Sequence, residues 1–320
     1  MEKIVFMGSP RYAEIILREL YDRFDIVGVI TQPDKRVGRG RSFQFPPVKF
    51  FAKEKEIPLL QPRKLTAENF IYVLSNWDPD VIIVAAYGKI LRPQILEFPR
   101  FGCINVHASY LPRWRGASPI QAAILNGDQT AGVTIMKMDE GIDTGDIITQ
   151  KEVGISEFET TASLTEKLAT IGAKLLVNTL SPYIKGKIIP EKQLSKNATY
   201  AGLIKKQDGL LDFQKSAEEL ERQIRAYDPW PICYFYWNGK NVKVYSARVI
   251  KSHHLKPGQR GVIEKYPCIG TKTYDLLLVK VQMPGKKKIS GNVFLNGARN
   301  WVEKKGKRMI YKNRRKRNEK

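Results

Sequence analysis

Two polar residues lie two positions apart in the stretch at residues 104–112, which reads INVHASYLP. We expect Asn105 and His107 to sit at the end of a strand, where both side chains point to the same side of the sheet. A carboxamide N–H beside a protonated imidazole suits the stabilisation of an oxyanion that develops on a carbonyl carbon. Pro112 prevents the strand from continuing and fixes the course of the next loop. Taken alone, however, the pair fits a turn-capping asparagine and a buried, hydrogen-bonded histidine better than an active site.

A glycine-punctuated acidic loop follows a second strand-like run at residues 132–147, which read GVTIMKMDEGIDTGDI. One of its carboxylates could pair with His107, keep the imidazole protonated and relay a proton. The spacing does not decide between the four candidates, which are Asp139, Glu140, Asp143 and Asp146. A cluster of acids could equally hold a hard cation, but the regular D-x-D-x-D-G spacing of calcium loops is absent, so we expect no metal.

The elements that must position these residues alternate between strands and helices over residues 1–190. Residues 3–7 read as a strand, and Ser9-Pro10 as the N-cap and first turn of a helix that extends to about Phe24. The apolar, β-branched runs at 26–30 and 81–86 are typical of parallel strands covered on both faces. Helical stretches are expected near 48–56, 66–75, 118–126 and 161–181. The pattern predicts a doubly wound, Rossmann-like α/β domain, whose ligand crevice lies beyond the carboxyl ends of the strands.

A second, smaller domain is expected at residues 209–302, after a linker at 191–208 that shows no periodicity. One helix at 217–225 precedes short strand-like runs separated by turn dipeptides such as Asn238-Gly239. This pattern predicts a small β-barrel, OB-like, or a β-sandwich. We expect Trp230, Trp237 and Trp301 to be core residues of it rather than base-stacking platforms. Residues 303–320 form a basic tail with ten Lys and Arg against two Glu.

Composition and charge limit the classes of protein. The 320 residues, 42% of them hydrophobic, suffice for two domains, and no apolar run approaches the ~18 residues of a membrane span, so we expect a cytoplasmic protein. The net charge of +22 is uneven: residues 1–190 carry 24 Lys and Arg against 21 Asp and Glu, whereas residues 191–320 carry 30 against 11. A basic domain joined to a nearly neutral one indicates a polyanionic partner. Three scattered cysteines argue against a disulfide framework and a zinc site.

The residues around His107 belong to a longer signature. The segments INVHASYLPRWRGASPIQAAILNGD and GVTIMKMDEGIDTGDII resemble the core of the 10-formyltetrahydrofolate-dependent formyltransferases, in particular of the members that act on methionyl-tRNA. Further similarity is found in IVFMGSP at 4–10, TQPDKRVGRGR at 31–41, VAAYGKIL at 84–91, IRAYDPWP at 224–231, VKVYSA at 242–247 and LNGARNW at 295–301. The resemblance therefore extends over both expected domains.

The resemblance implies roles for individual residues. The catalytic trio of the family matches Asn105, His107 and Asp143, so it selects one acid where the spacing could not. The folate-binding positions that it implies are Ser109, Tyr110, Leu111, Pro112, Ala85, Ala86, Tyr87, Ile90, Leu91, Met138, Asp139 and Gly141. The family usually has Gly-Ser-Leu-Leu-Pro after the histidine, whereas this chain has Ala108 and Tyr110, which we expect to alter the shape of the pocket.

The resemblance also implies the reaction and its partners. The co-substrate would be 10-formyltetrahydrofolate, and the formyl group would pass to the α-amino group of initiator methionyl-tRNA. Apart from the resemblance, we expect a monomer and no metal. The loop at 31–41 would contact the acceptor end of the tRNA through Arg36, Arg39 and Arg41, and Lys206 would lie near it. Because the Gly38-x-Gly40 pair lacks a third glycine and no helix obviously starts there, we expect no dinucleotide site.

Two alternatives remain open from the sequence. Formyltransferases that act on a nucleotide-linked sugar or on glycinamide ribonucleotide use the same Asn, His and Asp, and some carry a similar β domain. The other alternative is a folate-independent RNA-binding protein with the α/β domain as scaffold, against which the complete trio argues. The basic loop and the basic second half favour tRNA over a small amine, whereas the fold alone does not decide.

Overall fold

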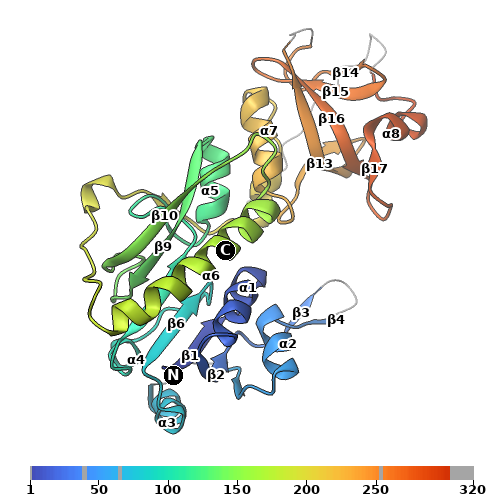
Figure 1. Cartoon of the computed structure of the whole chain (residues 1–320). Coiled ribbons are helices and arrows are strands. Elements are labelled where there is room, and N and C mark those ends of the chain that lie inside the picture. Colours follow the sequence, from blue (N-terminus) through green and yellow to red (C-terminus); the bar gives the residue numbers. More distant parts are fainter. Residues whose placement is uncertain (1, 38–41, 64–66, 252–254, 303–320) are drawn as a thin grey trace, which may run out of the picture. The chain divides into compact units, whose positions relative to one another are not determined.

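The computed structural model describes residues 2–37, 42–63, 67–251 and 255–302 of the chain (Figure 1). The chain forms two compact units. The first contains the residues up to 206 together with 225–231, and the second contains residues 207–224 together with those from 232 onward. Among the helices of the described ranges, none has both the length and the apolar character needed to cross a membrane.

A seven-stranded sheet with the strand order β10-β9-β7-β6-β1-β2-β5 is the centre of the first unit. Its strands are β1 (Lys3–Gly8), β2 (Asp25–Ile30), β5 (Leu59–Leu60), β6 (Val81–Ala85), β7 (Cys103–His107), β9 (Thr130–Lys137) and β10 (Ile147–Gly154). The first five of these run parallel, whereas β9 is antiparallel to both β7 and β10. The doubly wound α/β domain is confirmed, with an antiparallel edge in addition.

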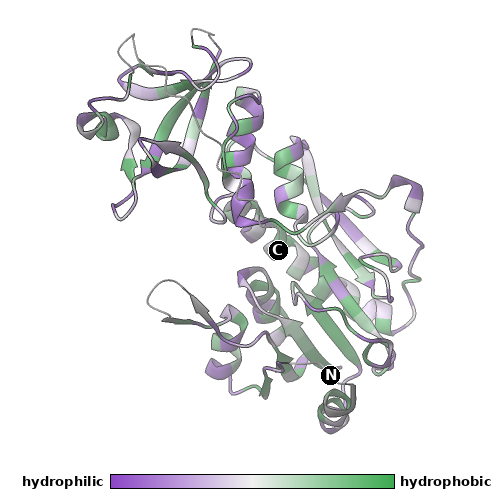
Figure 2. Ribbon diagram, turned by 180° about the vertical axis from the view of Figure 1, so that it is seen from behind, coloured by the Kyte–Doolittle hydropathy of each residue, from purple (hydrophilic) through white to green (hydrophobic). Residues whose placement is uncertain are grey.

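Helices cover the two faces of this sheet (Figure 1). They are α1 (Arg11–Tyr21), α2 (Pro47–Glu54), α3 (Ala67–Trp77), α4 (Pro93–Leu96), α5 (Pro119–Asn126) and α6 (Thr161–Ile184). The long helix α6 packs against α1, and its Gly172 allows a close approach to the sheet: a Cβ there would lie 3.1 Å from Val106 Cγ1. On the opposite face, Phe70 and Leu74 of α3 pack in one cluster with Cys103. Every residue of β6 and β7 is buried, and for β6 its wholly apolar sequence predicts this. The hydrophobic residues of the chain are concentrated in the strands of this sheet (Figure 2).

The alternation of side chains along β7 decides which way the polar pair faces. Val106 points to α6, so Asn105 and His107 point to the face on which Cys103 lies. Two pairs of short strands lie outside the main sheet: β3 (Lys35–Val37) with β4 (Ser42–Gln44) after β2, and β8 (Arg115–Gly116) with β11 (Tyr200–Ala201). The predicted start of α1 was wrong in one respect. Ser9 does not cap the helix, because its hydroxyl accepts from Gln32 N at 2.9 Å.

The second unit is a six-stranded antiparallel sheet with α7 (Ala217–Ala226) and α8 (Gly291–Gly297), which bears out the predicted small β domain. Its strands are β12 (Cys233–Trp237), β13 (Lys240–Ile250), β14 (Arg260–Ile263), β15 (Tyr266–Gly270), β16 (Asp275–Gln282) and β17 (Ile289–Ser290). Phe294, Trp237 and Trp301 form a core of edge-to-face rings with centroids 5.4–5.9 Å apart. The placement of Trp230 in the core was wrong: it belongs to the first unit and is 53% exposed.

Candidate active site

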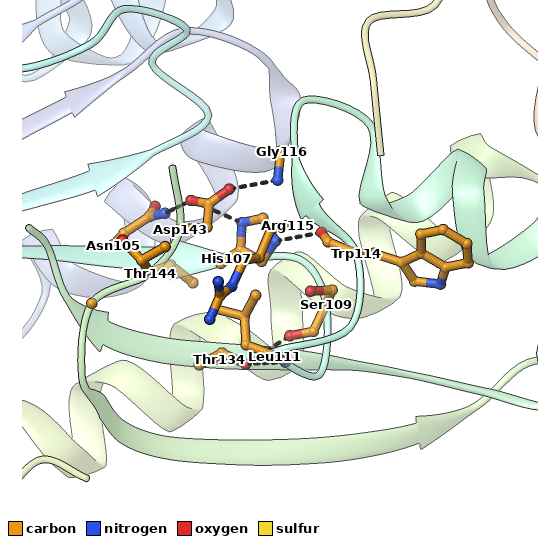
Figure 3. A network of polar contacts seen from close by, with 12 residues as sticks. Asn105, His107, Ser109, Leu111, Trp114, Arg115, Gly116, Thr134, Asp143 and Thr144 are labelled. Atoms are coloured by element: carbon orange, nitrogen blue, oxygen red, sulfur yellow. Dashed lines mark hydrogen bonds and ion pairs between the residues drawn. The ribbon is translucent and has the colours of Figure 1, made fainter. Parts of the chain in front are cut away.

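The structure brings Asn105 and His107 of β7 together with Asp143, which lies in the loop between β9 and β10 (Figure 3). Asn105 Nδ2 donates to Asp143 Oδ1 at 3.3 Å, and His107 Nδ1 lies 3.6 Å from the same oxygen. The strand itself buries both residues, which are 9% and 6% exposed. The spacing of two in the sequence thus does place the amide and the imidazole side by side, as predicted.

Asp143 is held in place by a backbone N–H and a side-chain amide from two other segments. Its Oδ2 accepts from Gly116 N at 2.7 Å, while its own carbonyl accepts from Gln193 Nε2 at 2.9 Å. Its φ of 52° lies in the left-handed region, which aspartate tolerates better than most side chains do. A non-glycine residue in this conformation persists only where its surroundings hold it, and such residues cluster at functional sites.

Gln193 links the acidic loop to β8. Its Nε2 also donates to Gly145 O at 2.7 Å, and its Oε1 accepts two bonds from Arg115, at 2.8 and 3.1 Å. Arg115 is only 2% exposed, so a charged group is buried in the wall of the site. No local pattern marks Gln193, because it lies in a segment without periodicity that we expected to be a linker.

The second nitrogen of His107 also has a partner in the protein. His107 Nε2 lies 3.1 Å from Trp114 O, and a carbonyl oxygen can only accept. The ring therefore faces one acceptor on each side, a carbonyl and a carboxylate. A proton on Nε2 would satisfy the carbonyl, and a ring protonated on both nitrogens would in addition form an ion pair with Asp143.

The loop after β7 uses its polar groups to fix its own course. Ser109 Oγ donates to Arg113 O at 2.6 Å, and Leu111 N donates to Thr134 Oγ1 at 3.1 Å. Tyr110 is 45% exposed and packs over Gly132, where a Cβ would lie 2.8 Å from Tyr110 Cβ. An open depression of about 520 Å³ borders this loop, and the trio does not line it; its lining includes Ser109, Tyr110, Leu111 and Pro112.

The other expected folate positions divide between buried and exposed ones. Tyr87 and Leu91 belong to one buried apolar cluster after β6, against which Met138 packs. Ala85 ends β6 and is buried, whereas Ala86 and Ile90 are exposed. Asp139 lies in an exposed turn, accepting from Gly141 N at 3.0 Å.

Tyr87 has a hydroxyl that is buried without a hydrogen-bond partner among the described residues. Burial raises the pKa of this phenol to about 12, so the group stays protonated and available as a donor. In folded proteins, a buried polar atom of this kind normally has a hydrogen-bond partner.

The expected tRNA contacts are placed only in part. Arg39, Arg41 and the tail at 303–320 lie outside the described residues. Arg36 lies on β3 and pairs in register with Phe43 of β4, but its side chain is outside the description. Lys206 is exposed and begins a short 3₁₀ helix, at the end of the first unit.

Among the described residues, no group of three or more His, Cys, Asp or Glu side chains is arranged so that it could hold a metal ion. The three cysteines are free and buried. Burial raises the pKa of both Cys103 and Cys268 to about 12, so neither is a ready thiolate.

A doubly wound domain in which the inner strand β7 carries a buried asparagine and histidine beside a carboxylate suits an enzyme that acts at a carbonyl carbon. The chain belongs to the formyl transferase family: the formyl transferase domain matches residues 2–180, and the formyl transferase C-terminal domain matches residues 203–299.

Relatives and solved structures extend the comparison. Methionyl-tRNA formyltransferase of Pseudoalteromonas translucida is 42% identical over 305 residues, which cover 94% of this chain and 95% of that protein. The enzyme of the same name from Bacillus subtilis is 43% identical over 303 residues, which cover 93% of this chain and 95% of that protein. The fold is shared with HypX from Aquifex aeolicus in complex with tetrahydrofolic acid, with a TM-score of 0.63, 17% identity and coverage of 94% of this chain and 48% of that one. It is also shared with an N-formyltransferase from Helicobacter canadensis in complex with folinic acid and dTDP-3-aminofucose. That structure has a TM-score of 0.66 and 22% identity, and the match covers 88% of this chain and 100% of that one.

Proposed function

We propose that this protein transfers the formyl group of 10-formyltetrahydrofolate to the α-amino group of initiator methionyl-tRNA. The assignment of the substrate rests on sequence identity. The chain is 42–43% identical, over nearly the whole of both chains, to relatives named for that activity. The sugar N-formyltransferase from Helicobacter canadensis is only 22% identical, which supports the fold alone. The excess of 30 Lys and Arg over 11 Asp and Glu in residues 191–320 suits a polyanionic substrate.

The reaction needs one carbon–nitrogen bond to form and another to break. The neutral amine attacks the formyl carbon on N10, giving a tetrahedral oxyanion, and the bond from that carbon to N10 then breaks. The proton lost by the amine ends on N10, so the products are N-formylmethionyl-tRNA and tetrahydrofolate. No covalent bond to the enzyme is required.

The trio supplies groups that suit each part of this step. Asn105 uses one amide proton on Asp143, which leaves the second for the oxyanion. Both nitrogens of His107 have protein partners, so we assign it the stabilisation of the oxyanion chiefly by its positive charge. Asp143 holds the imidazolium and, through water, helps move the proton from the amine to N10.

The folate would lie between the loop after β7 and the apolar cluster after β6. Tyr87, Leu91 and Met138 offer an apolar wall, and the unpartnered hydroxyl of Tyr87 is a group that a polar ring would satisfy. Ser109, Leu111 and Pro112 would then contact the folate through their backbone groups, because the Ser109 hydroxyl already donates to Arg113 O.

Formylation of three amines with one folate donor tests the proposed function. We expect methionyl-tRNA to be formylated at a kcat/KM at least about 100-fold above that for free methionine or for a nucleotide-linked amino sugar, because the basic half supplies affinity only to the polyanion. The initiator tRNA is expected to be preferred over the elongator. Equal or better formylation of the amino sugar would contradict the assignment of the substrate.

Removal of residues 304–320 is a second test, aimed at the basic tail. The deletion takes away ten Lys and Arg, so tRNA binding should weaken and the dependence of log Kd on log salt should become less steep. Binding of the formyl-folate donor should not change. An unchanged salt slope, measured by titrating fluorescent tRNA at several salt concentrations, would show that the tail makes no phosphate contacts.

A further inference from the structure

Trp114 has an unusual backbone conformation beside the trio. Its φ of 60° lies in the left-handed region, which is costly for a residue with a large side chain. In this conformation its carbonyl oxygen lies 3.1 Å from His107 Nε2, while the indole points away from the ring of His107 (Figure 3). Backbone strain of this kind persists only where other contacts hold the residue in place.

Asp128 supplies one of these contacts, to the indole. Trp114 Nε1 donates to Asp128 Oδ2 at 2.7 Å, and Arg113 donates to both oxygens of the same carboxylate, at 2.9 and 2.6 Å. The guanidinium carbon of Arg113 also lies 4.5 Å from the centroid of the Trp114 ring. The side chain of Trp114 is therefore held at its N–H and at one face, by two residues that are bound to each other.

The end of α5 fixes the position of Asp128. Gly127 follows α5 with a φ of 74°, and Asp128 N then donates to Ala123 O at 3.0 Å. The Asp128 side chain is only 10% exposed. Burial by itself would raise the pKa of this carboxyl, but hydrogen bonds from three side chains, Arg113 among them, outweigh burial and lower the pKa. Asp128 is thus a charged acceptor at neutral pH.

A third segment holds the backbone on either side of the Trp114 side chain. Trp114 N donates to Thr199 Oγ1 at 2.9 Å, and Arg115 N donates to Thr199 O, also at 2.9 Å. The peptide group that carries the Trp114 carbonyl therefore has Thr199 on its N–H side and His107 on its oxygen side. The bond to Asp128 adds an anchor at the side chain, which opposes rotation of Trp114 out of the left-handed region.

We propose that Asp128 is a positioning residue for His107, which it affects by holding the Trp114 indole and with it the carbonyl that faces Nε2. Its carboxylate contacts neither the trio nor the reacting atoms, so its effect must pass through Trp114. The inference rests on the proposed function for its effect on turnover, but not for its effect on the imidazole itself.

The carbonyl of Trp114 matters because His107 lies between two acceptors. Asp143 Oδ1 lies 3.6 Å from Nδ1, and the carbonyl lies 3.1 Å from Nε2, so the two compete when the ring carries a single proton. With the carbonyl held in place, Nε2 keeps that proton and Nδ1 faces Asp143. The ring can then lose and regain its Nδ1 proton beside the carboxylate without turning over.

Trp114→Phe is the first test, because it removes the indole N–H and keeps an aromatic ring beside Arg113. The ¹⁵N chemical shifts of the imidazole nitrogens in the full-length protein show which nitrogen carries the proton. They are followed as the pH is raised until they no longer change. The chain has only two other histidines, so the signals missing from His107→Gln identify His107. We expect the last proton on Nε2 in the wild type and a shift of it toward Nδ1 in the variant.

Kinetics of the same variant separate positioning of His107 from shaping of a pocket. We expect kcat for methionyl-tRNA formylation to fall about tenfold, with the KM for each substrate unchanged. Arg113, Trp114 and Asp128 also line the open depression beside the loop after β7. A role confined to the shape of that depression would raise a KM and leave kcat as in the wild type.

Asp128→Ala tests the carboxylate directly. It should lower kcat at least as much as Trp114→Phe does, and it should also lower the melting temperature, because Arg113 and the indole lose their acceptor. If Asp128 acts through the indole N–H, the double variant should be no slower than Asp128→Ala alone. Asp22→Ala removes an exposed aspartate at the end of α1 and should change neither kcat nor the imidazole signals.

Four results would overturn the inference. These are an Nε2 that keeps its proton in Trp114→Phe as in the wild type, a kcat within about twofold of wild type in both single variants, a loss confined to KM, and losses that multiply in the double variant. If the wild type formylates methionyl-tRNA and one of these is observed, only the role of Asp128 fails. If the wild type does not formylate methionyl-tRNA but the proton shifts as expected, the proposed function fails and the role of Asp128 stands.

Discussion

Replacement of His107 by alanine is expected to lower kcat by at least about 10²–10³-fold at saturating folate donor and methionyl-tRNA. The variant removes the positive charge that we assign to the oxyanion and leaves Asp143 without the ring 3.6 Å from its Oδ1. Asn105→Ala should cause a loss of similar size, because it removes an amide donor on the same side of β7. Initial rates of formyl-methionyl-tRNA formation measure both effects.

Controls for this experiment follow from the contacts of the two residues. His107→Gln retains an N–H for Trp114 O but not the charge, so it should fold at least as well as the alanine variant and remain inactive. Asn76→Ala removes an exposed carboxamide of α3 and should be fully active. Activity within about tenfold of wild type in a folded His107→Ala protein would refute the role of this residue.

Gln193→Ala should reduce both stability and turnover. It removes the acceptor of two bonds from buried Arg115 and the donor to the carbonyls of Asp143 and Gly145. Leaving these groups unpaired is expected to lower the free energy of unfolding by about 2–4 kcal/mol. Because Asp143 then loses one of its anchors, kcat should fall about 10–100-fold. Denaturant unfolding and single-turnover kinetics report the two effects separately.

Gln193→Glu distinguishes the two functions of this side chain. The carboxylate still accepts from Arg115, so most of the stability should be retained, but it faces the carbonyls of Asp143 and Gly145 with an oxygen in place of an amide. Turnover should therefore be as low as in the alanine variant. Gln94→Ala, at an exposed glutamine of α4, is the matched control and should change neither quantity. Normal turnover in a folded Gln193→Glu protein would show that this residue does not position Asp143.

The sequence predicts most of the fold because its strongest local patterns are also the buried ones. The apolar runs of β2 and β6 have a single environment that suits them, a sheet covered on both faces. Ser9 and Trp230 were misplaced for the same physical reason. Their local patterns, a capping dipeptide and an aromatic residue, were outweighed by tertiary contacts: Ser9 bonds to the segment after β2, and Trp230 belongs to the first unit.

The candidate site was predictable where its residues share a strand. Strand β7 itself brings Asn105 and His107 together. Asp143 reaches them through a loop, and no periodic pattern in the sequence predicts the path of that loop. The resemblance to the family selected Asp143 among four acids. Nothing local marks Gln193, Arg115 or the carbonyl of Trp114, because their importance comes from contacts between segments far apart in the sequence.

The first unit is completed by residues that follow part of the second unit in the chain. Residues 225–231 return to it, where Ala226 O accepts from Thr161 Oγ1 at 2.6 Å and Arg225 donates to Glu159 O at 2.9 Å. The two units are consequently not separable by one cleavage. A fragment that stops before 225 would expose the start of α6, and one that stops at 190 would also lack Gln193. Grafting a different second unit onto this enzyme therefore requires two junctions, as for an inserted domain.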